Sequence, residues 1–405
     1  RSTLVADFII EAVLEQLSIK KELFQFLETI NSQETIFATN TSSIPITQIG
    51  GSLKHPERLV GVHFFNPAHI MKLVEVIKGV ATDPIIAEKA FNWSQSLGKK
   101  TVYAADAPGF IVNRVARHYY VESLKALEEN VAPLEQIDRL LESSGFKMGP
   151  FKLMDLIGVD TNFSVTSSMY QQFHQDPKFR PNRIQQQKVD AGHHGRKTKQ
   201  GFYKKTKDEK GNKVILSLNL KSLEYETQKR VNYASLSQAK EIEDLRKRLK
   251  FLYHSKDEAG EFYREMFSDI FAYVSHRIPE ISDETFRIDQ AMKAGFGWEL
   301  GPFEIWDAIG TQAAYDQALE LGKDIAPWVK EMLDKGVGSF YQIKGSSIEY
   351  FDKDEKKFKA LPNQEGLTNL HVRKENNTIW KSDVASLIDL GNDVVNLEFH
   401  SKMNA

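Results

Sequence analysis

The sequence contains no cysteine, which excludes disulfides, thiolate metal sites and a cysteine nucleophile. Neither charge is in excess, because 53 Lys and Arg residues stand against 55 Asp and Glu residues, for a formal net charge of -2. Such a balance offers no broad basic field for nucleic acid. The histidines show no spacing typical of metal ligands, so we predict a protein without a metal site.

Long apolar runs are also missing. The longest stretch without a charged residue, residues 35–53, is rich in Thr, Ser, Gly, Asn and Pro, and is therefore too polar to span the hydrocarbon core of a bilayer. No signal peptide is recognisable. We therefore expect a cytoplasmic protein that does not insert into a membrane. The sequence reaches an apparent strand by Ala6 and closes at Ala405 without a terminating element, so we expect both ends to be cut from a longer polypeptide.

The first part of the chain, residues 1–105, alternates between short apolar runs and amphipathic stretches. Apolar, β-prone runs predict strands, whereas apolar residues at helical spacing predict helices. The alternation of the two indicates an α/β layer fold. Strands are predicted at residues 7–10, 35–38, 59–66, 71–77 and 101–103, helices at 15–27 and 84–97, and a short turn or helix at 46–49.

From residue 106 the pattern becomes helical, and an internal repeat divides it. Helices are predicted at 111–129, at 134–143 and from Pro150 onward, and the polar segment 206–230 is typical of a connector. The offset between the repeats is 151 at the first pair and 152 at the rest. We therefore predict two tandem copies of one helical domain, residues 106–205 and 231–342. The repeated residues are Ile137-Asp138, Gly149-Pro150-Phe151, Asp155 and Ile157-Gly158, which recur as Ile288-Asp289, Gly301-Pro302-Phe303, Asp307 and Ile309-Gly310.

The last segment, residues 343–405, returns to short β-prone runs separated by Lys, Asp, Asn and Gly turns. This pattern predicts a β-containing tail, in which no catalytic cluster is visible. Strands are predicted at residues 348–351, 371–372, 378–380 and 394–399.

One pair of residues is the leading candidate for chemistry. His63 lies at the end of one apolar run, and Glu75 follows twelve residues later among Leu73, Val74, Val76 and Ile77. Burial of an unpaired carboxylate is costly, so Glu75 needs a partner, which a nearby imidazole would supply. A general base and its orienting group are often delivered to a cleft in this way. The alternative is a structural histidine that is satisfied in the core.

Three further groups of polar residues stand near predicted element ends. Residues 40–43, Asn-Thr-Ser-Ser, follow a strand and either bind a cofactor amide or substrate oxygen, or form an ordinary polar turn. Glu11 and Glu15 either face the same edge or are carboxylates favoured by a helix dipole. Asn113 either lies in an interdomain cleft beside His63 or ties two domains together through hydrogen bonds.

Taken together, five motifs resemble those of the L-3-hydroxyacyl-CoA dehydrogenases of fatty-acid β-oxidation. They are His63-Phe64-Phe65-Asn66-Pro67, Met71-Lys72-Leu73-Val74-Glu75, Asn40-Thr41-Ser42-Ser43, Pro108-Gly109-Phe110-Ile111-Val112-Asn113-Arg114 and Gly149-Pro150-Phe151. The resemblance holds in order and spacing over residues 5–205, and the repeated helical unit extends it to about residue 340. It implies a Rossmann-like dinucleotide-binding domain over residues 1–105, before the two helical copies.

The resemblance also implies roles for individual residues. NAD is the implied cofactor and an acyl-CoA the implied substrate. His63 would take the proton of the substrate 3-hydroxyl while hydride passes from C3 to NAD, and Glu75 would set the tautomer of His63 and stabilise its imidazolium. Substrate contacts are implied for Ser42, Asn66 and Asn113, and cofactor contacts for Glu15, Lys20, Asn40 and Ser42.

One feature of the family is missing, because the 405 residues contain no G-x-G-x-x-G motif. In the family this loop holds the cofactor pyrophosphate at a helix N-terminus. We therefore expect the first βαβ unit of the dinucleotide domain to be absent, and NAD to bind this chain weakly or not at all. A catalytically silent fragment and an acyl-CoA-binding scaffold stand as alternatives to the dehydrogenase.

The end of the chain resembles a second family. Residues 386–391 and 397–405 are similar to the opening strands of an enoyl-CoA hydratase (crotonase) domain. This similarity implies a multifunctional parent with the dehydrogenase first and the hydratase second, and a thiolase as a partner in a β-oxidation complex. In family members with one helical copy that domain forms a homodimer, so we expect the second copy to replace the dimer partner.

Overall fold

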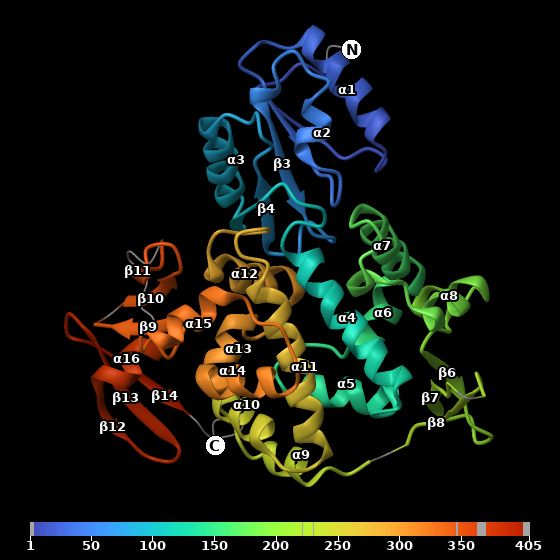
Figure 1. Cartoon of the computed structure of the whole chain (residues 1–405), viewed down its shortest axis with the longest axis vertical. Coiled ribbons are helices and arrows are strands. Elements are labelled where there is room, and N and C mark those ends of the chain that lie inside the picture. The colour runs from blue at the N-terminus through green and yellow to red at the C-terminus, as the bar shows by residue number, and fades with distance from the viewer. Residues whose placement is uncertain (1–3, 221, 230, 346, 363–369, 400–405) are drawn as a thin grey trace. The chain divides into compact units, whose positions relative to one another are not determined.

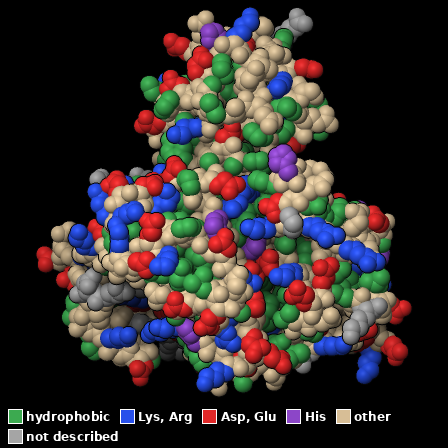
Figure 2. Space-filling view, in the orientation of Figure 1, with side chains coloured by type: hydrophobic (Ala, Val, Ile, Leu, Met, Phe, Trp, Pro, Cys, Tyr) green, Lys and Arg blue, Asp and Glu red, His purple; other side chains and the backbone are tan. Residues whose placement is uncertain are grey.

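The computed structural model describes residues 4–220, 222–229, 231–345, 347–362 and 370–399. The chain forms two compact units, residues 1–329 and 330–405 (Figure 1). Throughout these described ranges, no helix combines the length and the apolar character that crossing a bilayer requires. On the face drawn in Figure 2, the Lys and Arg side chains are interspersed with Asp and Glu.

The N-terminal part of the first unit is a five-stranded sheet in the order β1-β2-β3-β4-β5. Strands β1, β2 and β3 are parallel, β4 is antiparallel to β3, and β5 is parallel to β4. The predicted α/β fold is therefore confirmed. The strands are β1 (Phe8–Glu11), β2 (Ile36–Thr39), β3 (Leu59–Phe64), β4 (Leu73–Ile77) and β5 (Lys100–Ala104), and the helices are α1 (Leu17–Ile30), α2 (Ile46–Gly50) and α3 (Pro84–Ser96).

Helices cover both faces of this sheet, α3 on one side and α1 with α2 on the other (Figure 1). The alternation of side chains along β2 explains the arrangement. Ile36 and Ala38 pack in one cluster with Ala87 and Ala90 of α3, whereas the ring of Phe37 lies 5.7 Å from that of Phe24 on α1. Strands buried on both faces carry near-continuous apolar runs, which is why the sequence predicted them well.

The rest of the first unit is mainly helical, as predicted. A first helical group comprises α4 (Val112–Glu128), α5 (Leu134–Ser143), α6 (Pro150–Ile157), α7 (Val159–Gln172) and α8 (Arg183–Asp190). A second helical group comprises α9 (Ala234–Ala239), α10 (Leu245–His254), α11 (Glu258–Ser275), α12 (Thr285–Ala291), α13 (Pro302–Ile309) and α14 (Thr311–Glu320). A π-turn, Met292–Phe296, follows α12, and α15 (Pro327–Asp334) begins where the first unit ends.

The repeated sequence pattern corresponds to a repeated contact. Asp138 accepts hydrogen bonds from the N–H groups of Phe151 (2.9 Å) and Lys152 (3.2 Å), which open α6. In the second helical group, Asp289 accepts them in the same way from Phe303 (2.9 Å) and Glu304 (3.1 Å), which open α13. The glycines before the two helices, at positions 149 and 301, lie so close to these aspartates that a Cβ would overlap the Asp backbone.

The segment predicted as a connector, residues 206–230, instead contains most of a three-stranded antiparallel sheet. Its strands are β6 (Tyr203–Lys207), β7 (Lys213–Leu218) and β8 (Tyr225–Thr227). Val214, Leu216 and Leu218 share one face of β7, but the apolar Ile215 on the other face and the surrounding lysines and aspartates masked a period of two in the sequence. The β6–β7 turn is closed by Asp208, which accepts a hydrogen bond from the N–H of Asn212.

In its described residues, the second unit contains the end of α15, two small antiparallel sheets and one further helix. The strands are β9 (Tyr341–Lys344), β10 (Ser347–Asp352), β11 (Lys357–Ala360), β12 (Thr378–Lys381), β13 (Ala385–Gly391) and β14 (Val394–Phe399). The β-containing tail is thus confirmed, but the strand predicted at 371–372 is wrong, because these residues lie in α16 (Leu370–Asn377). An apolar pair of this length does not distinguish strand from helix. Residues 400–405, part of the hydratase-like ending, lie outside the described residues.

Candidate active site

The predicted pair, His63 and Glu75, is brought into direct contact by the β3–β4 register, in which these two residues are opposite each other. His63 Nδ1 lies 2.7 Å from Glu75 Oε2, and the exposed fractions of the two residues are 6% and 0%. The second carboxylate oxygen, Oε1, accepts the N–H groups of Ile111 (3.1 Å) and Val112 (2.9 Å) at the start of α4. A buried carboxylate is therefore fully hydrogen-bonded and lies at the positive end of a helix dipole.

This arrangement prepares one nitrogen of His63 for proton transfer. A carboxylate accepts hydrogen bonds, so Nδ1 carries the proton that faces Glu75, and the lone pair of the neutral ring is on Nε2. No residue of the described ranges forms a hydrogen bond with Nε2. The rings of Phe65 and Phe110 lie 4.5 Å and 5.7 Å from the imidazole. Such an oriented imidazole with a free Nε2 can act as a general base.

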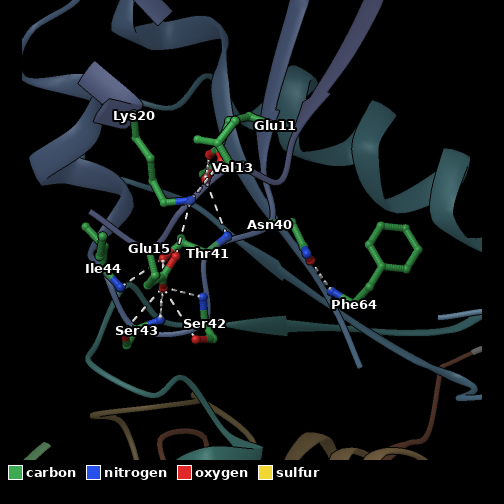
Figure 3. A network of polar contacts seen from close by, with 11 residues as sticks. Glu11, Val13, Glu15, Lys20, Asn40, Thr41, Ser42, Ser43, Ile44 and Phe64 are labelled. Atoms are coloured by element: carbon green, nitrogen blue, oxygen red, sulfur yellow. Dashed lines mark hydrogen bonds and ion pairs between the residues drawn. The ribbon is translucent and has the colours of Figure 1, made fainter. Parts of the chain in front are cut away.

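A second polar network lies at the carboxyl ends of β1 and β2 (Figure 3). Glu11, the last residue of β1, accepts hydrogen bonds from Lys20 Nζ (2.8 Å) and Thr39 Oγ1 (2.6 Å). Lys20 comes from the first turn of α1, is 1% exposed, and also lies 3.2 Å from Glu15 Oε2. The buried ammonium is thus held between two carboxylates, as a buried cation requires.

Glu15 connects this network to the loop that follows β2. Its Oε1 accepts hydrogen bonds from Thr41 Oγ1 (2.6 Å) and from the N–H of Ser42 (2.9 Å). Partial burial alone would raise the pKa of Glu15, but the hydrogen bonds from Thr41 and Ser42 and the charge of Lys20 lower that pKa below its ordinary value. Glu15 is therefore an anion at neutral pH that organises the loop.

Asn40 joins the two networks. Its Oδ1 accepts the N–H of Phe64 at 2.8 Å, which ties the residue after β2 to the residue after His63 (Figure 3). The carboxyl ends of three adjacent parallel strands thus share one connected set of polar groups. Ligands of open α/β sheets bind at this edge. Six predicted site residues, His63, Glu75, Glu15, Lys20, Asn40 and Ser42, take part in these networks.

Two predicted site residues, Asn66 and Asn113, take no part in these hydrogen-bond networks. Asn66 is exposed and Asn113 is half-buried, and neither side chain forms a hydrogen bond with any residue that the structure describes. Both adjoin residues of the site, since Asn66 is three residues after His63 and Asn113 follows Val112, whose N–H donates to Glu75. Their amides are free to bind a ligand. Whether the Ser42 hydroxyl contacts a substrate stays a prediction, because in this structure it lies 3.4 Å from Glu15 Oε1.

Sequence reasoning missed some participants. Thr39, whose hydroxyl bonds to Glu11, was not singled out, and Thr41, whose hydroxyl bonds to Glu15, was noted only as part of the group 40–43. Glu11 was noted only as a neighbour of Glu15. The backbone N–H donors of Ile111 and Val112 could not be predicted from the sequence, because every residue except proline has an N–H.

Comparison with known proteins identifies the fold and its relatives. The sequence model described as "3-hydroxyacyl-CoA dehydrogenase, NAD binding domain" matches residues 1–107, and the one described as "3-hydroxyacyl-CoA dehydrogenase, C-terminal domain" matches residues 109–205 and 266–339. A 3-hydroxybutyryl-CoA dehydrogenase of Clostridioides difficile is 40% identical over 198 residues, which cover 70% of that protein. This chain belongs to the 3-hydroxyacyl-CoA dehydrogenase family.

Two further relatives extend the similarity over most of the chain. A "Probable 3-hydroxyacyl-CoA dehydrogenase" of Bacillus subtilis is 36% identical over 408 residues, which cover 99% of this chain and 51% of that relative. The chain therefore spans about half the length of this relative. The crystal structure of 3-hydroxybutyryl-CoA dehydrogenase from Escherichia coli K12 is 32% identical, covers 82% of both chains and superposes with a TM-score of 0.65.

The residues at the sheet edge fit the NAD that this family uses. The groups nearest the edge are polar and partly exposed, namely the Asn40 amide, the Ser42 hydroxyl and the Glu15 carboxylate. Such groups can hydrogen-bond ribose hydroxyls and a nicotinamide amide. β1 is the edge strand of the sheet within the described part of the chain, and Ile10, Val13 and Leu14 beside it are 40%, 43% and 69% exposed.

Proposed function

We propose that this chain contributes the catalytic centre of an NAD-dependent 3-hydroxyacyl-CoA dehydrogenase, which oxidises (S)-3-hydroxyacyl-CoA to 3-oxoacyl-CoA. The observation that carries the proposal is the linked set of hydrogen bonds from the α4 N-terminus through Glu75 to His63. Such an assembly is costly to bury and serves no need of the sheet core, whereas a general base requires an oriented imidazole.

In the proposed reaction, His63 Nε2 accepts the proton of the substrate 3-hydroxyl while C3 loses hydride. NAD supplies the hydride acceptor when it is bound. Two electrons and one proton leave the alcohol with the hydride, and the second proton stays on His63 until solvent receives it. Glu75 stabilises the resulting imidazolium through Nδ1, and the two N–H groups of α4 hold the carboxylate in place.

The remaining site residues position the two ligands in this proposal. Ser42, Asn66 and Asn113 bind the reacting oxygen and the acyl thioester in this proposal, since they follow β2, β3 and Val112, respectively, and their side chains can donate or accept hydrogen bonds. Glu15, Lys20, Asn40 and Ser42 form the cofactor wall. We further propose that the pyrophosphate requires a glycine-rich loop on a strand beside the free edge of β1, because these 405 residues contain no such motif.

We also propose that the two helical groups are tandem copies of one domain that pack around a pseudo-twofold axis. Phe146 and Trp298, which are separated by the repeat offset of 152, form an antiparallel bridge with each other, and the N–H of Glu299 bonds to the carbonyl of Gly145 at 3.0 Å. Contact between equivalent positions is what an isologous interface produces. The second copy would then replace a dimer partner. A solution mass of twice 46.2 kDa at low concentration would argue against this.

For the longer parent we propose a cytoplasmic role in fatty-acid β-oxidation, with an enoyl-CoA hydratase domain after the dehydrogenase and a thiolase as partner. The support is the similarity of residues 386–391 and 397–405 to the opening of a hydratase domain. A pull-down of thiolase by the parent tests the partner, and hydration of crotonyl-CoA by the same protein tests the second activity.

The dehydrogenase proposal is tested by mixing the protein with acetoacetyl-CoA and NADH and following NADH absorbance. We expect NADH consumption that depends on both ligands, and no consumption by the His63→Gln variant. Calorimetric titration with each ligand accompanies the assay. Absence of turnover while NADH and acetoacetyl-CoA both bind would contradict the proposal, whereas failure to bind NADH alone would locate the defect in the phosphate-binding part.

A further inference from the structure

The second helical group packs closely, at Gly295, against two residues that flank the catalytic pair, Leu73 and Val112. Gly295 belongs to the π-turn Met292–Phe296 that follows α12, and Figure 1 shows α12 beside the lower end of β4 and the start of α4. A Cβ built on Gly295 would lie 2.5 Å from Leu73 Cδ2 and 3.1 Å from Val112 Cγ2. A side chain at this position would therefore force Leu73 or the turn itself to shift.

The two residues that Gly295 contacts belong to the segments that hold Glu75. Leu73 opens β4, and Glu75 is the next residue on the same face of that strand. Val112 opens α4, and its N–H donates to Glu75 Oε1 at 2.9 Å. The distance between β4 and the first turn of α4 sets the length of this hydrogen bond. The π-turn packs against both Leu73 of β4 and Val112 of α4, and so fixes the distance between these two segments.

A polar contact from the same helical group holds α4 from another side. Arg114, in the first turn of α4, is 0% exposed and donates from Nη2 to Glu280, which lies between α11 and α12. Its guanidinium also lies over the ring of Phe173 at 4.2 Å, and Nε lies 3.3 Å from the hydroxyl of Tyr273 on α11. A buried guanidinium with a bound carboxylate resists displacement, because separation would leave it unpaired.

The linker between the sheet and α4 is fixed by the same segment. The N–H of Ala105 donates to the carbonyl of Ile281 at 2.9 Å, and Ile281 follows Glu280 directly. Three independent contacts from the second helical group thus converge on residues 105–114, which supply the N–H donors of Glu75. None of these contacts involves His63, whose charged partner among the described residues is Glu75.

We propose that Gly295 and Glu280 are positioning residues for the His63–Glu75 pair: they set the α4 N-terminus against β4 and thereby the hydrogen bonds that hold Glu75 on His63. This inference rests on the proposed role of the pair in catalysis. The second helical group then has a role beyond its packing against the first helical group, because it fixes the geometry of the proton-transfer site. π-turns interrupt helices at functional positions in other proteins, which agrees with this role.

The first test is spectroscopic and needs no substrate or cofactor. In the free protein, the Nδ1 proton between His63 and Glu75 should give a low-field proton NMR signal, identified by its absence in His63→Gln. We expect Gly295→Ala to move or broaden this signal, because the new methyl pushes Leu73 and Val112 apart. Gly338→Ala is the matched control, since a Cβ at Gly338 meets nothing within 4 Å, and it should leave the signal unchanged.

Two further variants keep the test decisive. Adding Leu73→Val to Gly295→Ala removes the clashing Cδ2 and should restore the signal. Glu280→Gln weakens the hold on Arg114 without a steric clash and should shift the signal in the same direction as Gly295→Ala, by a smaller amount. A signal that is unchanged in Glu280→Gln and in folded Gly295→Ala would overturn the proposal.

The second test is kinetic. Misplacement of a catalytic group by a fraction of an ångström to 1 Å costs on the order of tenfold to hundredfold in kcat. We expect such a loss in Gly295→Ala with an almost unchanged KM for acetoacetyl-CoA, and recovery in the double variant. If the wild-type protein shows no turnover, the function proposed above fails, yet the NMR comparison still decides whether Gly295 and Glu280 position the pair.

Discussion

His63 and Glu75 are cross-strand partners on the antiparallel strands β3 and β4, with Nδ1 and Oε2 2.7 Å apart. Side chains directly opposite in an antiparallel pair lie on the same face of the sheet, so the contact follows from the register alone. The N–H groups of Ile111 and Val112 then hold the other oxygen of Glu75. The site therefore consists of a cross-strand pair of side chains and the first N–H groups of α4, and each of these parts can be tested by substitution.

Replacement of the imidazole should stop turnover and leave ligand binding largely intact. His63→Gln retains a polar side chain but removes the base, and a general base contributes roughly 10²–10⁴-fold to rate. Glu75→Gln should also reduce kcat, because the stabilising charge is lost and the amide NH2, a donor, replaces one of the two acceptor oxygens. Steady-state kinetics and calorimetry with acetoacetyl-CoA separate the two effects, and an unchanged rate in His63→Gln would refute His63 as the base.

The buried ammonium of Lys20 should be a large contributor to the stability of the N-terminal sheet. Lys20→Met leaves Glu11, which is 3% exposed, without its cation, and such broken buried pairs cost about 3–5 kcal/mol. Urea unfolding measures the loss. Adding Glu11→Gln removes the uncompensated charge and should recover part of it.

The matched control is Lys89→Met. Lys89 lies on α3, is exposed and forms no ion pair with any described residue, so its loss should change the free energy of unfolding by less than about 0.5 kcal/mol. Equal destabilisation by the two lysine variants would show that the buried ion pair of Lys20 contributes no more to the free energy of unfolding than an exposed lysine does.

The glycines before α6 and α13 should both resist substitution. In Gly149→Ala and in Gly301→Ala the added methyl overlaps the backbone of Asp138 and Asp289, respectively, and cannot be relieved by a rotamer change. We expect each variant to lose about 3 kcal/mol in the free energy of unfolding. Gly338→Ala, in open space, should leave the free energy of unfolding unchanged. An unchanged free energy in Gly149→Ala or Gly301→Ala would show that the backbone there moves away from the aspartate at little cost.

These features differ in how far the sequence could predict them. His63 and Glu75 were predicted because both side chains carry their chemistry visibly and stand in apolar runs whose period identifies strands. The sheet, the long helix α4 and helix α5 were predicted for the same reason. The partner of Glu75 was not, because backbone N–H groups leave no mark and Val112 lies 37 residues further along the chain.

The errors also have physical causes. Strand β7 was missed because Ile215 interrupts the alternation of apolar and polar residues, and because its sheet has only three short strands rich in charged residues. His371 and Val372 were assigned to a strand although they open a helix, since two residues show no period. The role inferred for Gly295 could not be foreseen, because a glycine in a sequence does not reveal which distant side chains approach it.

A last prediction concerns acid stability and His118 on α4. This histidine is 8% exposed, its ring stacks on Tyr273 at 4.6 Å, and its Nε2 forms no hydrogen bond among the described residues. Burial, together with the positive charges of Lys178 and Arg277, lowers the pKa of His118 from 6.5 to about 4, although the charge of Asp269 opposes this shift. Glu122 Oε1, at 3.8 Å, is too distant for a hydrogen bond.

Because this pKa is lower in the folded than in the unfolded protein, the unfolded state binds more protons as the pH falls below 6.5. The stabilisation is complete above that pH and disappears as the pH falls towards 4. The protein should lose about 2 kcal/mol from this group between about pH 7 and pH 5. His118→Phe keeps the stacking on Tyr273 but cannot titrate, so urea unfolding at the two pH values should show a smaller loss by that amount. His69→Phe, at an exposed position, is the control, and if His118→Phe shows the wild-type dependence, another buried group controls the acid transition.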